Sequence, residues 1–259
     1  MTQPFQLARF HSLLNTRALG RNLIFEATVG STMDLARDAA LHGAPEGTLA
    51  LADEQTAGRG RLGRTWVTPP ALNLASTLLL RPPRSVLREI AMIAPLAVCD
   101  AMEEIAGVHA DIKWPNDVQI RGKKAAGILV ETDLTDEAHS YALVGCGINV
   151  NFDPSEHEEI RNIATSMKAE TGRDIDRGAL LASYLLHFER MYYAAQSGAS
   201  PLQRWRERLI TLGQHVHASW PGGAADGIAE DVSQDGSLIV RAAAGERVTV
   251  EAGDVTLRE

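Results

Sequence analysis

Apolar residues recur along the chain with two different spacings, which predict where helices and strands lie. A helical spacing of apolar residues over 85–105 predicts a long helix, and Pro95 inside it predicts a kink or a short break. A second helix is expected to begin at Ser31 or Thr32, which are good capping residues, and to end at Gly43. Further helices are expected over 177–195 and 200–212.

Short apolar runs between these helices predict strands. They cover 48–52, 111–120, 125–131 and 141–151. The basic turn at 121–124 joins two of them as a hairpin, which favours antiparallel pairing. We therefore predict an α+β fold, with a mixed, largely antiparallel sheet flanked by helices.

The pattern changes after Gly213, where only short strand-like runs remain. They lie at 216–220, 227–232, 238–242 and 247–250, and glycine-containing turns separate them. This spacing is typical of a small all-β module. Two domains are therefore expected, 1–212 and 213–259.

Composition narrows the class of protein. The chain has 259 residues, 45% of them hydrophobic and 22% charged, as in an ordinary globular enzyme. A net charge of -8 argues against general nucleic-acid binding. No apolar run is long enough for a membrane span, and the N-terminus lacks the apolar core of a secretory signal. Cys99 and Cys146 lack CxxC spacing, which favours core thiols in a reducing compartment and predicts a cytoplasmic location.

Against this acidic background, the segment 58–64 contains three glycines, three arginines and no acidic residue. Arginine forks match phosphate oxygens, and glycine lets backbone N–H groups approach an anion. A site for a multiply charged anion is therefore expected, the alternative being a solvated basic loop. The glycine spacing also matches the dinucleotide-binding pattern, but Pro69 and Pro70 follow where that pattern needs a helix. We reject the dinucleotide-binding interpretation.

A second polar cluster, 113–117, has the sequence Lys-Trp-Pro-Asn-Asp. Lysine suits a phosphate and aspartate suits Mg²⁺, although the cluster could also be a polar strand end closed by a turn. Lys124 precedes a strand with Gly127 inside it, which is expected where a ligand approaches or simply after a solvated turn. The pair His215 and His217 could begin a metal site, but a structural or surface pair is favoured because no cysteine follows at ligand spacing.

Taken together, these motifs resemble biotin–protein ligases over nearly the whole chain. The motifs are Ser-Thr-Met at 31–33, the glycine-arginine run with Trp66, the 113–117 cluster, 124–131 and 145–150. The resemblance implies a mixed sheet followed by a small SH3-like barrel. It also implies a two-step reaction in which ATP and biotin form biotinyl-5′-adenylate, which then acylates a lysine of a biotin carboxyl carrier protein domain.

The resemblance assigns roles to individual residues. The implied biotin-binding residues are Ser31, Thr32, Gln55, Gly58, Arg59, Gly60, Arg61, Lys124 and Gly127. The implied ATP-binding residues are Arg61, Arg64, Trp66, Lys113, Asn116, Asp117 and Asn149, with Asp117 also holding Mg²⁺. The residues implied in catalysis are Arg59, Arg61, Lys113 and Lys124.

Two departures from the family pattern qualify the resemblance. The family often has asparagine where this chain has Met33, so a polar contact is lost. About twenty residues precede the first expected strand, too few for the DNA-binding domain of some members, which predicts a ligase without DNA binding.

A homodimer is possible. The rival interpretations are a lipoyl or octanoyl ligase or transferase and a non-enzymatic biotin sensor.

Overall fold

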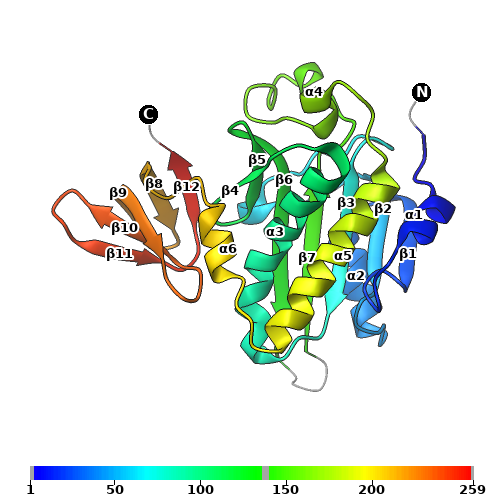
Figure 1. Cartoon of the computed structure of the whole chain (residues 1–259), viewed down its shortest axis with the longest axis horizontal. Coiled ribbons are helices and arrows are strands. Elements are labelled where there is room, and N and C mark those ends of the chain that lie inside the picture. Colours follow the sequence, from blue (N-terminus) through cyan, green and yellow to red (C-terminus); the bar gives the residue numbers. More distant parts are fainter. Residues whose placement is uncertain (1–2, 136–139, 258–259) are drawn as a thin grey trace.

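The computed structural model describes residues 3–135 and 140–257, which form a large sheet with helices on both faces and a second, smaller sheet (Figure 1). The strands of the large sheet are β1 (Leu23–Val29), β2 (Leu49–Gln55), β3 (Leu74–Leu80), β4 (Asp111–Lys113), β5 (Asp117–Ile120), β6 (Lys123–Asp133) and β7 (Tyr141–Ile148). The helices are α1 (Leu7–Leu13), α2 (Thr32–Leu41), α3 (Leu87–Ala106), α4 (Met167–Thr171), α5 (Arg177–Gln196) and α6 (Leu202–Glu207). The smaller sheet contains β8 (His215–Trp220), β9 (Gly223–Val232), β10 (Leu238–Ala242), β11 (Arg247–Val250) and β12 (Asp254–Leu257).

The large sheet has the strand order β1-β2-β3-β7-β6-β5-β4. Only the β1–β2 pair is parallel among the pairs of this sheet in the described chain, and the others are antiparallel. The predicted α+β class and the mixed, largely antiparallel sheet are therefore confirmed.

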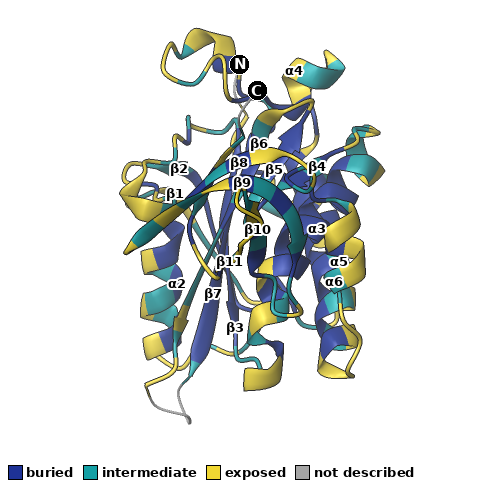
Figure 2. Cartoon of the chain, turned by 90° about the vertical axis from the view of Figure 1, so that its left-hand side faces the viewer, coloured by how far each residue is buried: buried dark blue, intermediate teal, exposed yellow. Residues whose placement is uncertain are grey.

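The two faces of this sheet carry different apolar layers, because successive side chains of a strand point to opposite sides. Ala50, Leu79 and Leu143 pack with Met33 and Ala36 of α2. The alternating residues of the same strands pack into the main core, which includes most of α3 and α5. Figure 2 shows α2 on one side of β3 and β7, with α3 and α5 on the other. The sheet is thus a middle layer between α2 and the α3–α5 pair.

The smaller sheet packs against the end of the large one beside β4 and α6 (Figure 1). Trp114 is buried at this junction, where its indole N–H donates to the carbonyl of Gly236 over 2.9 Å. The strand order is β11-β10-β9-β8-β12, and within the described residues the two edge strands do not pair with each other. The expected closed SH3-like barrel is therefore corrected to an open five-stranded antiparallel sheet.

Three local expectations also change. The strand predicted over 111–120 is interrupted, because a turn with a cis Trp114–Pro115 bond separates β4 from β5. The helix predicted over 200–212 ends earlier, since α6 stops at Glu207 and turns follow. At Pro95 a break is excluded, because α3 runs through it.

In the described part of the chain, every helix is too short or too polar to cross a membrane.

Candidate active site

One row of paired residues crosses the large sheet and forms the floor of a cavity. Ala75 pairs with Gly147, Gly147 with Gly127, Gly127 with Asp117, and Asp117 with Lys113. Directly paired residues lie on the same face of a sheet. The neighbouring residue Gly145 faces α2, because a Cβ there would lie 2.7 Å from the sulfur of Met33. The floor therefore lies on the α2 face, beyond the N-terminus of α2, and small residues form its part from Ala75 to Gly127.

A β-bulge brings Lys124 onto the same face. Gln119 pairs with Lys124, whereas Asp117 pairs with Gly127, so β6 has one extra residue at this point. A bulge of this kind re-aims the side chains that follow it. The Lys124 Nζ consequently lies 2.5 Å from Oδ1 of Asp117, and the pair is partly buried. Lys113 is also partly buried, and its ammonium group forms no ion pair or hydrogen bond with any described residue.

Trp66 lies flat on the glycine floor. A Cβ on Gly147 would lie 2.4 Å from Cε2 of Trp66, and one on Gly127 would lie 3.2 Å from Cζ3. The Lys124 ammonium lies 5.6 Å from the centroid of the Trp66 ring, within range of a cation–π contact. The indole N–H is buried without a hydrogen-bond partner among the described residues. Glycine is therefore required at 147 for this packing.

The other end of the cavity is polar and is built by the start of α2. The Ser31 hydroxyl caps the helix by accepting from the N–H of Met33 over 3.3 Å. Thr32 donates from its N–H and its hydroxyl to Oε1 of Gln55, over 2.8 and 3.0 Å. Because Gln55 uses its carbonyl oxygen in this way, its amide group remains available for a ligand, apart from a long 3.4 Å contact to Thr68.

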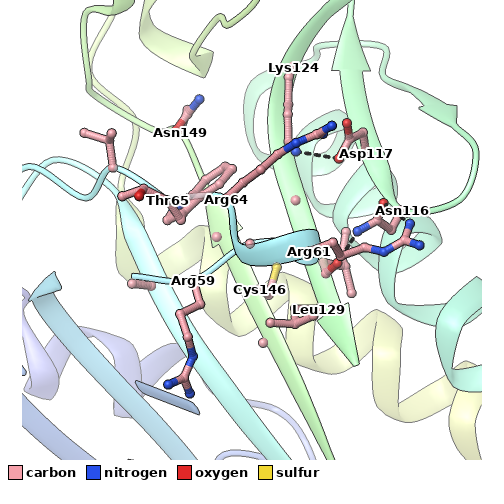
Figure 3. Close-up of a pocket in the computed structure, with 18 of the residues that line it drawn as sticks. Arg59, Arg61, Arg64, Thr65, Asn116, Asp117, Lys124, Leu129, Cys146 and Asn149 are labelled. Atoms are coloured by element: carbon pink, nitrogen blue, oxygen red, sulfur yellow. Dashed lines mark hydrogen bonds and ion pairs between the residues drawn. The ribbon is translucent and has the colours of Figure 1, made fainter. Parts of the chain in front are cut away.

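The three arginines of the glycine-rich loop, residues 58–64, point in different directions (Figure 3). Arg59 pairs with Asp34 on α2. Arg61 donates to Oδ1 of Asn116 over 3.1 Å and to the carbonyl of Gly253, the residue before β12, over 2.9 Å. Arg64 pairs with Asp254 of β12. The loop therefore bridges α2, the large sheet and the smaller sheet.

Electrostatic effects differ along this loop. The hydrogen bond from Arg59 lowers the pKa of the Asp34 carboxyl and raises the pKa of the Arg59 guanidinium. Burial lowers the pKa of Arg61, the most enclosed of the three. Burial also raises the pKa of the Cys146 thiol, beneath the cavity, to about 12. Cys146 is therefore a protonated core residue at neutral pH.

The cavity measures about 380 Å³ and gathers almost all the residues that the sequence singled out. They are Ser31, Thr32, Gln55, Arg59, Gly60, Arg61, Arg64, Trp66, Lys113, Asn116, Asp117, Lys124, Gly127 and Asn149. Gly58 lies instead at the base of the loop, where its carbonyl accepts from the N–H of Trp66 over 2.9 Å. The Asn149 amide is already engaged by Thr165 and Asn73, so it supports the wall.

Sequence reasoning missed several members of the site. No functional role was predicted for Asp34 or for Asp254. Gly147 carried a visible signal, since it is one of two glycines in an apolar strand. The pair His215 and His217 does not line the cavity. Among the described residues, no group of three or more His, Cys, Asp or Glu side chains could hold a metal ion by itself.

Comparisons with known proteins agree with this architecture. Residues 25–149 match the biotin/lipoate A/B protein ligase family, and 211–258 match the biotin protein ligase C-terminal domain. The bifunctional ligase/repressor BirA of Bacillus subtilis is 36% identical over 88% of this chain and 71% of its own length. The biotin–[acetyl-CoA-carboxylase] ligase of Mycobacterium tuberculosis is 33% identical over 91% of this chain and 88% of its own.

Solved structures give the same result. A biotin protein ligase from Aquifex aeolicus in complex with biotin and ATP has a TM-score of 0.79 and 30% identity, covering 92% of this chain and 99% of its own. The fold and the cavity thus define an acyl-protein ligase of the biotin/lipoate class. Within that class, the chain belongs to the biotin protein ligases.

Proposed function

We propose that this enzyme activates biotin with ATP and transfers it to a lysine of a biotin carboxyl carrier protein domain. The observation that carries the proposal is that one cavity has a polar end at Ser31, Thr32 and Gln55 and a cationic end at Lys113 and Lys124. A glycine floor joins the two ends. Such a cavity suits a ligand that is apolar in its middle and meets a polyanion at one end.

In the first half-reaction, the biotin carboxylate attacks the α-phosphate of ATP and pyrophosphate leaves. No protein nucleophile is needed, so the protein's task is to position the reactants and to neutralise charge. Lys124 is placed to contact the carboxylate and the α-phosphate together, because the bulge directs it over the floor. Lys113 and Arg64 would contact the remaining phosphates, and Trp66 would separate the two ligands.

The residues present fit an Mg²⁺ ion only if the phosphates of ATP supply part of its ligands. Of the two described carboxylates that line the cavity, Asp117 and Asp254, Asp117 lies beside Lys124 at the cationic end, and Mg²⁺ commonly uses one or two carboxylates together with substrate phosphates. When bound, the ion would neutralise phosphate charge. Asp117 now pairs with Lys124, so we expect Lys124 to exchange this carboxylate for the ligand's anionic oxygens.

In the second half-reaction, the amine of the acceptor lysine attacks the acyl carbon and AMP leaves. The acceptor must approach the cavity from outside, where Val67 and Ile163 are exposed apolar side chains of the cavity lining. A cytoplasmic location, an absence of DNA binding and a possible homodimer stay predictions.

The test is a transfer assay with a purified carrier domain, biotin, ATP and Mg²⁺, followed by streptavidin capture of the product. We expect capture only with the complete mixture, and none when the acceptor lysine is replaced by arginine. Acylation by octanoate or lipoate but not by biotin would contradict the biotin assignment.

A further inference from the structure

Arg59 of the glycine-rich loop and Asp34 of α2 form a two-pronged ion pair at the edge of the cavity. The two guanidinium nitrogens Nη1 and Nη2 lie 3.0 and 2.6 Å from Oδ2 and Oδ1 of Asp34. Figure 3 shows the Arg59 side chain directed away from Arg64, Lys124 and Asp117. Both terminal nitrogens of the Arg59 guanidinium are therefore bonded to Asp34, on the side away from the cationic end.

This pair belongs to a chain of four charges from three parts of the fold. Asp34 also accepts from Nη1 of Arg37 over 2.9 Å, and Arg37 pairs with Glu131 of β6. Asp34 lies in the first turn of α2, where the helix dipole stabilises a carboxylate. The Asp34 carboxylate that accepts from Arg59 is thus also fixed by Arg37 and by its position in the first turn of α2.

We propose that Asp34 is a positioning residue of the ligase reaction: it anchors Arg59 so that the glycine-rich loop stays over the cavity between adenylate formation and transfer. The inference rests on the proposed function. Asp34 lies in the same first turn of α2 as Thr32, two residues further along, so the anchor ties the loop to the helix turn that lines the other end of the cavity.

The anchor role distinguishes Arg59 from its neighbour Arg61. The Arg61 guanidinium is directed inward and bonds to Asn116, a residue that lines the cavity. Arg59 is 42% exposed in its side chain, and its partner carboxylate is 53% exposed. Exposed pairs contribute modestly, so we expect its loss to change adenylate release about fivefold, which corresponds to about 1 kcal/mol.

The experiment is a double-mutant cycle with Asp34→Asn, Arg59→Ala and the double variant. Adenylate formation is measured as pyrophosphate release in a single turnover, and adenylate release as its appearance in the filtrate. Asp38→Asn, one turn further along α2, and Arg9→Ala, whose pair with Asp176 lies elsewhere, are the matched controls. Asp34→Glu keeps the charge and tests rescue.

Each single variant should release adenylate about fivefold faster than the wild type, and Asp34→Asn should change the rate of formation less than twofold. The double variant should release it no faster than the singles, Asp34→Glu should restore part of the retention, and both controls should behave as wild type. Raised salt should speed release from the wild type more than from Asp34→Asn, because salt screens an exposed pair.

Wild-type retention in Asp34→Asn, or effects of the two single variants that multiply in the double, would overturn the anchor and leave the proposed function standing. A wild-type chain that forms no adenylate from biotin and ATP would overturn both.

Discussion

The Nζ atom of Lys124 lies 2.5 Å from Oδ1 of Asp117, although in an unbroken alternation Lys124 would point to the opposite face from Gly127. The bulge in β6 changes this direction and makes Lys124 a cavity residue. Its neighbour Lys123 is exposed and pairs in register with Ile120. Two adjacent lysines therefore have opposite environments, which provides a matched pair for mutation.

Lys124→Ala should reduce adenylate formation by about a hundredfold or more, as when a charge-stabilising donor is removed from an active site. Lys123→Ala should leave the rate within about twofold, since it changes only an exposed side chain. Single-turnover pyrophosphate release compares the two. Equal rates for the two variants would show that the bulge does not select the functional lysine.

Gly147→Ala should weaken ligand binding about tenfold. The new methyl group would lie 2.4 Å from Cε2 of Trp66, and overpacking of this kind costs roughly 1–3 kcal/mol. Gly30→Ala is the control, because nothing lies within 4 Å of a Cβ there and its φ is not positive. Calorimetric titration with biotin and with ATP gives the affinities, and unchanged values for Gly147→Ala would contradict the packing described for Trp66.

Arg61→Ala should raise the release of free adenylate about tenfold or more. The variant removes both the bond to Asn116 and the bond to the Gly253 carbonyl, and with them the link from the loop to the smaller sheet. Arg84→Ala, an exposed arginine outside the cavity, is the control. The same filtration assay measures the effect, and full retention in Arg61→Ala would exclude this residue from loop closure.

The two cysteines should not react with a thiol reagent at pH 8 in the folded enzyme. Burial raises the pKa of both thiols to about 12, so only about one molecule in ten thousand carries a thiolate at either position. Unfolding in guanidinium should expose two equivalents, matching the two cysteines of the sequence. Fast modification of the native enzyme would contradict the burial of Cys99 or Cys146.

Trp114→Phe should lower the free energy of unfolding by about 1–2 kcal/mol, because the Gly236 carbonyl loses its indole donor in a buried junction. Denaturant melts of the variant and of the wild type measure the difference. A matched control is Trp220→Phe, whose side chain is only partly buried and lies in the smaller sheet away from the cavity lining. A larger loss of unfolding free energy for Trp220→Phe than for Trp114→Phe would contradict a stabilising role of the Trp114–Gly236 hydrogen bond.

Local patterns were enough to predict α2, α3, α5 and most strands, because their apolar spacing and caps are strong signals. The interruption of the strand at Trp114 was not predictable, since an apolar residue followed by proline also fits an edge strand. The open edge of the smaller sheet was equally unpredictable. It depends on which strands pair, and the apolar spacing within one strand does not indicate its pairing partner.

The site shows the same division between local and long-range information. The sequence marked Lys113, Asp117 and Gly127 as unusual residues in apolar runs, but only the cross-strand register places them in one row. The Arg59–Asp34 and Arg64–Asp254 pairs join residues 25 and 190 positions apart, and no pattern within a short window can reveal such contacts.

The most direct test of the central claim is pyrophosphate release from ATP and Mg²⁺ by the purified enzyme, measured with and without biotin and before any acceptor is added. We predict release that requires biotin and stops after about one turnover per active site, because the loop retains the adenylate. Pyrophosphate release that does not depend on biotin, or biotin binding without any release, would contradict it.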